Sequence, residues 1–250
     1  MRFGELTFEE IAEAVALDAL AVLPTGCTEQ QGPHLTVDFD SWFAEALMVS
    51  AAERVADRLS VVVLPALPFG PTPEHRAFGA GFIDVPVPVY DELVRSILDS
   101  LADQGFKRIL VWRGCGGHDL REVTTQFNHD NAGRASAFLP GHPFHEIWCR
   151  VGDASVPGGH ADSFTTSIVM YRRPERLRRD RIPAATSATP DWSDPRLDFR
   201  RYSDTGVIGS AAHADVERGR HLWDECVQAA AELMLRIDNA PDTVNIAPTM

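Results

Sequence analysis

The sequence predicts an α/β domain built on a mainly parallel sheet that helices cover on both faces. Three observations favour this class. Short, continuously apolar segments recur along the first half of the 250 residues, as in strands that are buried on both faces. Segments with helical periodicity lie between them, which is the alternation of βαβ units. Neither an internal repeat nor a linker interrupts the chain, so we expect one domain over residues 1–250.

The N-terminal elements are predicted by a helix cap and an apolar run. Residues Thr7–Glu10 have the sequence of a capping box, and apolar residues with helical spacing follow it. Leu20–Pro24 is apolar throughout and leads into a turn that contains glycine, which predicts a buried strand. Asp40 or Ser41 then caps a helix that continues to about residue 59.

The next strand and helix lie on either side of an irregular loop. Val61–Leu64 is apolar and mostly β-branched, and Pro65 ends it. Residues 68–75 are rich in proline and glycine, so we expect a loop there. Tyr90–Gln104 has helical periodicity and stops at Gly105, where a glycine commonly ends a helix.

The remaining elements complete the alternation. Ile109–Trp112 is another apolar strand, and a helix over about residues 119–131 follows its glycine-rich turn. Residues 183–206 are rich in proline, aspartate, serine and arginine, which indicates a surface excursion. A closing helix spans about residues 215–237.

Ionisable residues gather where the predicted strands end. In open parallel sheets, ligands bind beyond the carboxyl ends of the strands. Residues 24–40, 66–81 and 113–119 follow three strands, and residues 158–162 open a further helix. These segments contain Glu29, His34, Asp38, Asp40, His75, Cys115, His118, Asp119, His160 and Asp162. Such a concentration predicts a catalytic pocket at this edge.

Charge and composition exclude several classes of protein. The net charge of −13 argues against nucleic-acid binding through a basic face. No apolar run approaches the roughly 20 residues that a membrane span requires. The first residues lack the apolar core of a signal peptide, and four scattered cysteines do not form a disulfide framework. We therefore expect a cytoplasmic protein with reduced thiols.

Cys115 is the most suggestive single residue. It follows a strand, within a glycine-rich turn that precedes a helix, and a helix N-terminus lowers a thiol's pKa. Gly116 and Gly117 are candidate oxyanion donors through their backbone N–H groups. His118 and His160 are candidate bases, and Glu29 is a candidate acid or orienting group. The alternative interpretation is that Cys115 is a small apolar filler.

Two further histidines are candidate substrate contacts. His75 lies in the proline-rich loop, a composition suited to a lid beside the pocket. His34 follows Gly32 and Pro33, and it either contacts substrate or hydrogen-bonds its own loop.

Five segments, in order along the chain, resemble motifs of the creatininase (creatinine amidohydrolase) family. Residues 26–35, with Asp40 after them, resemble the family's Gly-small-x-Glu-Gln-His-Gly-Pro-His-Leu signature and its aspartate. The other four matches are residues 73–79 (substrate loop), 114–117 (Asn-Gly-His-Gly-Gly-Asn turn), 160–167 (His-Ala-Gly-x-x-Glu-Thr-Ser helix start), and 206–209 with 219–220 (C-terminal segment). The matches span about 200 residues, from 26 to 220.

The resemblance implies a three-layer α/β/α protein, often hexameric, that hydrolyses cyclic amides, formamides or related C–N bonds. It also implies two divalent metals, zinc or manganese, bridged by an aspartate and held by glutamate and histidine. Such metals polarise the amide carbonyl and supply hydroxide at neutral pH.

This sequence departs from the family's ligand pattern. Glu29 and Asp40 match a ligand and the bridging aspartate. Gln31 and Cys115 replace two histidines, Arg113 replaces the asparagine that leads the glycine-rich turn, and Thr165 replaces a glutamate. Neutral Gln and Thr bind these metals poorly, so a two-metal site is disfavoured. A single zinc held by Glu29, Asp40 and Cys115 is chemically allowed, and a site without metal is the equal alternative.

Three functions follow from these residues. The first is a creatininase-type enzyme that hydrolyses an amide or other C–N bond with a degenerate metal site. The second is a metal-independent enzyme on the same scaffold, with Cys115 or acid–base residues performing hydrolysis, cyclisation or acyl transfer in a biosynthetic pathway. The third is a non-catalytic relative that binds a small molecule. In each, we expect a small-molecule ligand and a homo-oligomer. The expected substrate contacts are Gln31, His34, His75, Arg113, Gly116, Gly117, Asp162 and Thr165.

Overall fold

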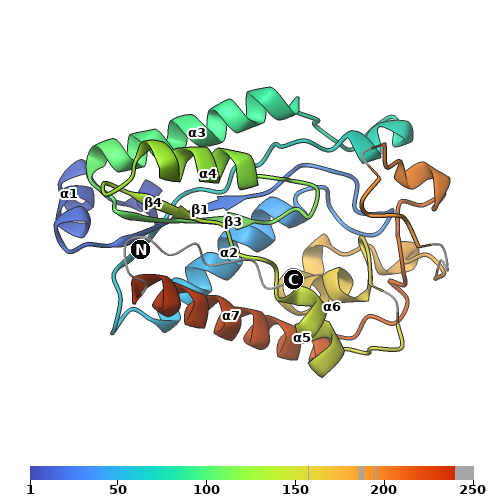
Figure 1. The fold of residues 1–250 in the computed structure, drawn as a ribbon. Helices are drawn as coiled ribbons and strands as arrows, with labels where there is room; N and C mark the ends of the chain where they lie inside the picture. Colours follow the sequence, from blue (N-terminus) through green and yellow to red (C-terminus); the bar gives the residue numbers. More distant parts are fainter. Residues whose placement is uncertain (157, 186–188, 195, 240–250) are drawn as a thin grey trace.

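The computed structural model describes residues 1–156, 158–185, 189–194 and 196–239, and a parallel sheet lies at its centre (Figure 1). Its strands are β1 (Leu20–Thr25), β2 (Val61–Val63), β3 (Arg108–Arg113) and β4 (Ser136–Phe138), in the order β2-β1-β3-β4. Leu20 of β1 is in register with Val61 of β2, and Ala21 is in register with Ile109 of β3. The predicted parallel sheet is confirmed.

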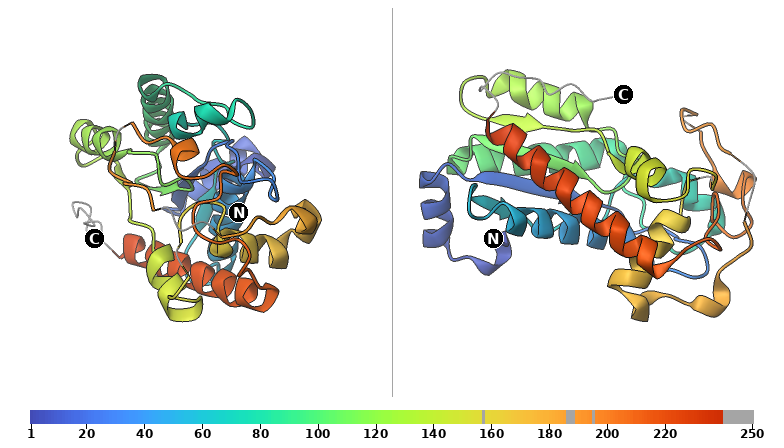
Figure 2. Two further views of the ribbon diagram at one scale, coloured as in Figure 1. Left: turned by 90° about the vertical axis from the view of Figure 1, so that its right-hand side faces the viewer. Right: turned by 90° about the horizontal axis from the view of Figure 1, so that it is seen from below.

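Helices cover both faces of the sheet, which confirms the three-layer α/β/α architecture (Figures 1 and 2). One layer contains α1 (Phe8–Ala16), α3 (Val87–Gln104) and α4 (Arg121–Asp130). The other contains α2 (Phe39–Arg54), α5 (Phe144–Val151), α6 (Ser163–Arg172) and α7 (Val216–Asp238). No helix in these described ranges is long and apolar enough to cross a membrane.

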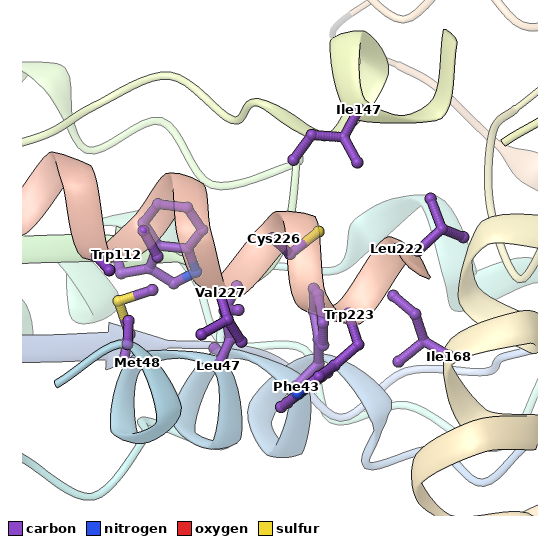
Figure 3. Close-up of a cluster of buried hydrophobic side chains, with 14 of the residues drawn as sticks. Phe43, Leu47, Met48, Trp112, Ile147, Ile168, Leu222, Trp223, Cys226 and Val227 are labelled. Carbon is purple, nitrogen blue, oxygen red and sulfur yellow. The ribbon is translucent and has the colours of Figure 1, made fainter. Parts of the chain in front are cut away.

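Alternate residues of the strands supply two separate cores. Ala21 and Leu23 of β1 belong to the core under α1, α3 and α4, while Leu20 and Val22 belong to the core under α2 and α7. This alternation follows from the two-residue period of a strand. Figure 3 shows the second core, in which Val227 and Trp223 of α7 lie against Leu47 and Phe43 of α2. Both faces are therefore buried, and polar chemistry is restricted to the ends of the strands.

Gly219 allows α7 to cross α6 closely. A Cβ atom at this position would lie 1.9 Å from the backbone oxygen of Ser167. We expect Gly219→Ala to destabilise the protein by about 3 kcal/mol, because the two helices must separate, although alanine is the better helix former. Gly4→Ala is the control, since its Cβ would meet only ordinary contact at 3.9 Å. Urea unfolding followed by circular dichroism measures both, and an unchanged midpoint for Gly219→Ala contradicts the prediction.

Most predicted element ends are confirmed, with one correction at α2. Thr7 forms both halves of its capping box, and Gly105 ends α3 in the left-handed conformation at φ 101°. Helix α2 begins at Phe39 and ends at Arg54, so the prediction of a cap at Asp40 or Ser41 and an end near residue 59 is wrong. The Asp40 carboxylate is not free to cap, because it accepts hydrogen bonds from side chains in the site.

The sequence patterns missed two short elements and did not indicate that part of residues 183–206, although mostly exposed or half-buried, lines the cavity. Strand β4 has three residues and α5 has eight, which is too few for a clear period. Residues 183–206 were predicted as a surface excursion, but Phe199 within them is buried, and residues 189, 192, 197 and 199 line the cavity described below. Positions 186–188 and 195 of this segment lie outside the described residues.

Candidate active site

A cavity of 730 Å³ opens at the carboxyl end of the sheet. The loop after β1, the proline-rich loop, the turn after β3 and the start of α6 all contribute to its lining, as predicted. Of the expected site residues, the lining includes Glu29, Gln31, Asp40, His75, Cys115, Gly116, Gly117, His160, Asp162 and Thr165. Asp162 also caps α6 by accepting a hydrogen bond from the backbone N–H of Thr165 at 3.1 Å.

Two carboxyl groups and two thiols meet at the floor of the cavity, which Glu29, Asp40 and Cys115 line while Cys27 is buried beneath them. Cys27 Sγ lies 3.0 Å from both Glu29 Oε2 and Asp40 Oδ2, so its single S–H proton can donate to either carboxyl group. The side-chain amide of Gln31 donates to Glu29 Oε1 and Asp40 Oδ2, each at 3.2 Å. Cys115 Sγ lies 3.8 Å from Glu29 Oε2. Residues from three separate segments therefore meet around the Glu29 carboxyl group.

The floor holds acidic groups without a basic side chain to balance them. Burial and the charge of Glu74 raise the pKa of Glu29 to about 7, despite the hydrogen bond from Cys27. Burial and the charge of Glu29 raise the pKa of Asp40 well above its usual value. Among the described residues that line the cavity there is no lysine or arginine. The cluster therefore either retains protons or binds a cation.

The environment of Cys115 contradicts the lowered thiol pKa that we predicted. A hydrogen bond from Cys27 lowers the pKa of Cys115, but burial and the charges of Glu29 and Asp40 outweigh it and raise the pKa to about 12. Helix α4 begins only at Arg121, six positions after Cys115, so its N-terminus does not contact the thiol. The nearby charges are negative, and they oppose formation of a thiolate in the absence of a metal.

Two histidines lie above Glu29. His75 Nε2 is 3.2 Å from Glu29 Oε2, and His160 Nδ1 is 3.5 Å from Glu29 Oε1. Burial lowers the pKa of both rings, that of His160 to about 3, so both are neutral at pH 7. The Phe199 ring lies 4.9 Å from the His75 ring and 5.1 Å from the His160 ring, and it closes this side of the site.

Aromatic side chains form the opposite wall. The Phe144 ring is 5.5 Å from that of Phe43 and 5.3 Å from that of Phe164, and Trp148 contacts Phe164 at 6.5 Å. These rings come from α2, α5 and α6. The cavity is therefore polar on one side and aromatic on the other, as in sites that bind organic ligands.

His118 and Arg113 lie behind the cavity rather than in its lining. The His118 ring packs between Tyr90 and Gly70, with Nδ1 3.2 Å from the Tyr90 hydroxyl. Its ring lies within 4.8 Å of the Cys27 and Cys115 sulfur atoms, with no hydrogen bond to either. Arg113 donates to the backbone oxygen of His118 and so holds the glycine-rich turn.

His34 is fully buried outside the cavity lining. Its Nε2 lies 2.9 Å from the Thr166 hydroxyl, and its Nδ1 has no partner. Its backbone oxygen accepts from the N–H of Arg178. Neither interpretation left open for His34 matches the structure, because its side chain does not line the cavity and its hydrogen-bond partner is Thr166 of α6 rather than its own loop.

Burial of neutral His34 predicts a loss of stability in acid. Burial lowers the pKa of His34 to about 4, against about 6.5 when unfolded. Between these pH values the unfolded chain binds the proton first, so the free energy of unfolding falls as the pH falls from 6.5 to 4, by up to about 3 kcal/mol. We expect His34→Gln, which retains a polar atom near Thr166, to reduce this loss. Unfolding at pH 7 and pH 4.5 measures it, and an equal loss in both proteins contradicts it.

The chain matches one protein family over most of its length. The family model for creatininase, described as creatinine amidohydrolase, matches residues 4–234. The chain belongs to the creatininase family. The creatinine amidohydrolase of Pseudomonas putida is 27% identical over 251 residues, covering 92% of this chain and 94% of that protein. The mycofactocin precursor peptide peptidase of Mycobacterium tuberculosis is 28% identical over 250 residues and covers 94% of each protein.

The fold is also that of the creatininases. A crystal structure of creatinine amidohydrolase (creatininase) superposes with a TM-score of 0.80 at 23% identity, covering 94% of this chain and 96% of that one. This likeness confirms the predicted fold. With the family established, the chain is a hydrolase of C–N bonds.

The floor of this creatininase-family site has the donors for one metal ion. Cys27, Glu29, Asp40 and Cys115 each offer a ligand atom, all four residues are buried, and the atoms lie within 4.8 Å of one another. Two sulfur and two oxygen donors suit a tetrahedral zinc. Glu29, His75 and His160 form a second group within the same limit. The donors fit a single zinc, with Cys27 added to the three ligands predicted from the sequence.

The sequence analysis missed the aromatic wall of the cavity and, around Glu29 and its two histidines, Cys27, Gln30, Glu74 and Phe199. Cys27 and Gln30 lie within the first matched motif, and Glu74 lies beside His75, so their positions were available as signals. Cys27 was set aside as one of four scattered thiols, and Gln30 as part of the family signature. Phe199 carries no such signal, because it lies in the segment predicted as a surface excursion.

Proposed function

We propose that this protein hydrolyses an amide bond in a substrate with an apolar or aromatic substituent, using Glu29 as its proton-transfer group. The observation that carries the proposal is one cavity with a buried carboxyl, thiol and imidazole cluster on one side and an aromatic wall on the other. The carboxyl supplies acid–base chemistry, and the wall supplies a binding surface for the rest of the substrate.

A single zinc is the cofactor that these residues would hold. Of the four donors, Cys27, Asp40 and Cys115 would be its ligands, which would leave the fourth position of a tetrahedral zinc for water, and zinc in such a site polarises the amide carbonyl and activates water. Gln31 would not ligate, because its amide nitrogen donates to Glu29 and Asp40 and fixes their orientation.

The surrounding residues are assigned to proton transfer and to substrate binding. Glu29, whose carboxyl group lies beside Cys27 and Cys115, would transfer a proton between water and the leaving nitrogen. Gly116 and Gly117, at the cavity surface, are the proposed contacts for the substrate carbonyl. Asp162 and Thr165 lie at the start of α6 and are the proposed polar contacts farther from the floor.

The cavity favours a peptide-like amide over a compact cyclic one. Its volume of 730 Å³ is that of a site for a drug-sized ligand. Phe144, Trp148 and Phe164 offer stacking surface to an aromatic or branched side chain. Of the two relatives, the mycobacterial peptidase acts on a peptide, and we propose that class here. The cytoplasmic location and the homo-oligomeric state stay predictions.

The metal-independent enzyme is the second candidate, and one observation favours it. Glu29 has a pKa near 7 between two neutral histidines, which is a suitable acid–base group without any metal. Cys115 as the nucleophile has less support, because its pKa of about 12 leaves it protonated.

One experiment tests the proposal against both alternatives. Protein expressed with added zinc is analysed for bound metal and assayed on short peptides, cyclic amides and formamides, before and after chelation. We expect about one zinc per chain, hydrolysis of peptides with an aromatic or branched residue, and loss of activity on chelation. Activity without metal would favour the second candidate, and no turnover of any amide would contradict an enzymatic role. Phe164→Ala should raise KM for the aromatic peptides, whereas Phe8→Ala, at an exposed position, should not.

A further inference from the structure

Gln30 lies behind the two histidines with its amide fixed by backbone groups. Its Oε1 accepts from the backbone N–H of Gly32 at 2.9 Å, and its Nε2 donates to the backbone oxygen of Gly206 at 3.3 Å. A backbone N–H only donates and a backbone carbonyl only accepts, so together they determine which end of the amide is nitrogen. Gly206 has φ 84°, and a Cβ there would lie 1.9 Å from Gln30 Oε1. The loop is therefore shaped around this side chain.

The amide determines where the proton of His75 lies. Gln30 Nε2 is 3.0 Å from His75 Nδ1, and an amide nitrogen can only donate. Nδ1 of His75 therefore presents a lone pair, and the proton of the neutral ring is on Nε2. That nitrogen lies 3.2 Å from Glu29 Oε2 without forming a hydrogen bond to it, so the protonated nitrogen of His75 is the one nearer the carboxyl group.

The backbone of the same residue determines the proton of His160. His160 Nε2 donates to the backbone oxygen of Gln30 at 2.7 Å, so its Nδ1 has the lone pair. Nδ1 lies 3.5 Å from Glu29 Oε1. Gln30 Nε2 also lies 3.4 Å from His160 Nε2, but both atoms are donors, and this contact adds nothing to the assignment.

We propose that Gln30 is a positioning residue that gives the two histidines opposite roles toward Glu29. Both rings carry the proton on Nε2, yet the ring nitrogen nearest Glu29 is the protonated one in His75 and the unprotonated one in His160. The lone pair of His160 is therefore on the nitrogen beside Glu29, whereas the lone pair of His75 is on the nitrogen beside Gln30. The importance of this arrangement for catalysis rests on the proposed function, whereas the proton positions do not.

The carboxylates offer a competing explanation for His75. Glu29 Oε2 at 3.2 Å and Glu74 Oε1 at 3.7 Å both lie near His75 Nε2 and would favour a proton there without Gln30. The variant Gln30→Glu separates the two explanations. The new side chain places an acceptor near His75 Nδ1, while the backbone oxygen that sets His160 is unchanged.

Long-range ¹H–¹⁵N spectra of protein labelled in histidine measure these proton positions directly. His75→Gln and His160→Gln assign the signals, and spectra are recorded with and without zinc at pH 7.5. We expect the proton on Nε2 in both rings of the unaltered protein. In Gln30→Glu, His75 gains a proton on Nδ1 and His160 does not change. Gln104→Glu, at the exposed end of α3, should alter neither.

Three results would overturn the proposal. They are a proton on His75 Nδ1 in the unaltered protein, a His75 signal unaffected by Gln30→Glu, and a change at His160 of the same kind as at His75. If Gln30→Glu does not fold, the spectrum of the unaltered protein still shows whether His75 carries its proton on Nδ1. In the active enzyme, we expect Gln30→Glu to lower kcat about tenfold or more with a smaller effect on KM. A protein without amide hydrolase activity would leave the spectroscopic result intact, so the two failures are distinguishable.

Discussion

Glu29→Gln should abolish amide hydrolysis while stabilising the metal-free protein. Removing a proton-transfer group costs a hydrolase about 1,000-fold in kcat/KM. The glutamine has nearly the same shape and can still accept from Cys27, so the fold is retained. Activity on the best peptide substrate, compared with that of the unaltered protein, measures the effect.

The stability gain in Glu29→Gln follows from the pKa of the buried carboxyl. Burial and the charge of Glu74 raise the pKa of Glu29 to about 7, against about 4.3 when unfolded. The folded state therefore retains the proton longer, and the free energy of unfolding falls as the pH rises from 4.3 to 7. Above pH 7 the cost is complete, at most about 3 kcal/mol, and glutamine removes it.

Thermal unfolding of chelated protein at pH 5 and pH 8 tests this sign. We expect Glu29→Gln to raise the melting temperature more at pH 8 than at pH 5. Glu232→Gln, on an exposed face of α7, is the matched control and should change neither stability nor activity. If Glu29→Gln retains a tenth of the activity, Glu29 is not the proton-transfer group.

Loss of the two thiols at the cavity floor is the second large effect. We expect Cys27→Ser and Cys115→Ser each to weaken zinc binding by at least about 100-fold, and the double variant to bind none, because serine is a poor ligand beside thiolate. Cobalt bound in place of zinc should show the near-ultraviolet absorption of two thiolate bonds, and each single variant should retain about half of it.

Cys149→Ser provides the control for the thiol variants, since Cys149 is exposed on α5 and lies outside the floor. It should leave the zinc content and the cobalt spectrum unchanged. A cobalt spectrum without thiolate absorption, or full zinc content in the double variant, would remove both cysteines from the metal site. In that case the carboxylates and histidines around Glu29 would be the remaining donors.

The order of elements was readable from the sequence because it depends on local patterns. Each of these patterns involves residues only a few positions apart: the apolar run of a strand, the capping box at Thr7 and the glycine that ends α3 at Gly105. The convergence of Glu29, Asp40 and Cys115 was also predictable, since the ends of parallel strands meet at one edge. The order of the elements and the shared edge of the sheet are therefore sufficient to locate the site.

The direction in which each side chain points, and the charges that surround it, could not be predicted from the sequence. The thiol of Cys27 turns toward Glu29 and Asp40, whereas that of Cys226 lies in the apolar core, and the matched motif marks the position of Cys27 but not the direction of its side chain. The hydrogen bond from Cys27 lowers the pKa of Cys115, but burial and the charges of Glu29 and Asp40 raise it further, which reverses the expectation from the glycine-rich turn and its helix. Phe199 closes the site from a segment about 125 residues away from His75 along the chain.

The sequence by itself therefore determined the family, the layers and the edge at which chemistry occurs. Only the tertiary structure decided which side chains share that edge and in what protonation state. The physical reason is that hydrophobic period and helix caps are local, whereas the pKa of a buried group depends on every charge and dipole around it. Glu29, the central carboxyl group, illustrates both points. The sequence motif identified it as a site residue, whereas burial and the charge of Glu74 in the folded protein raise its pKa to about 7.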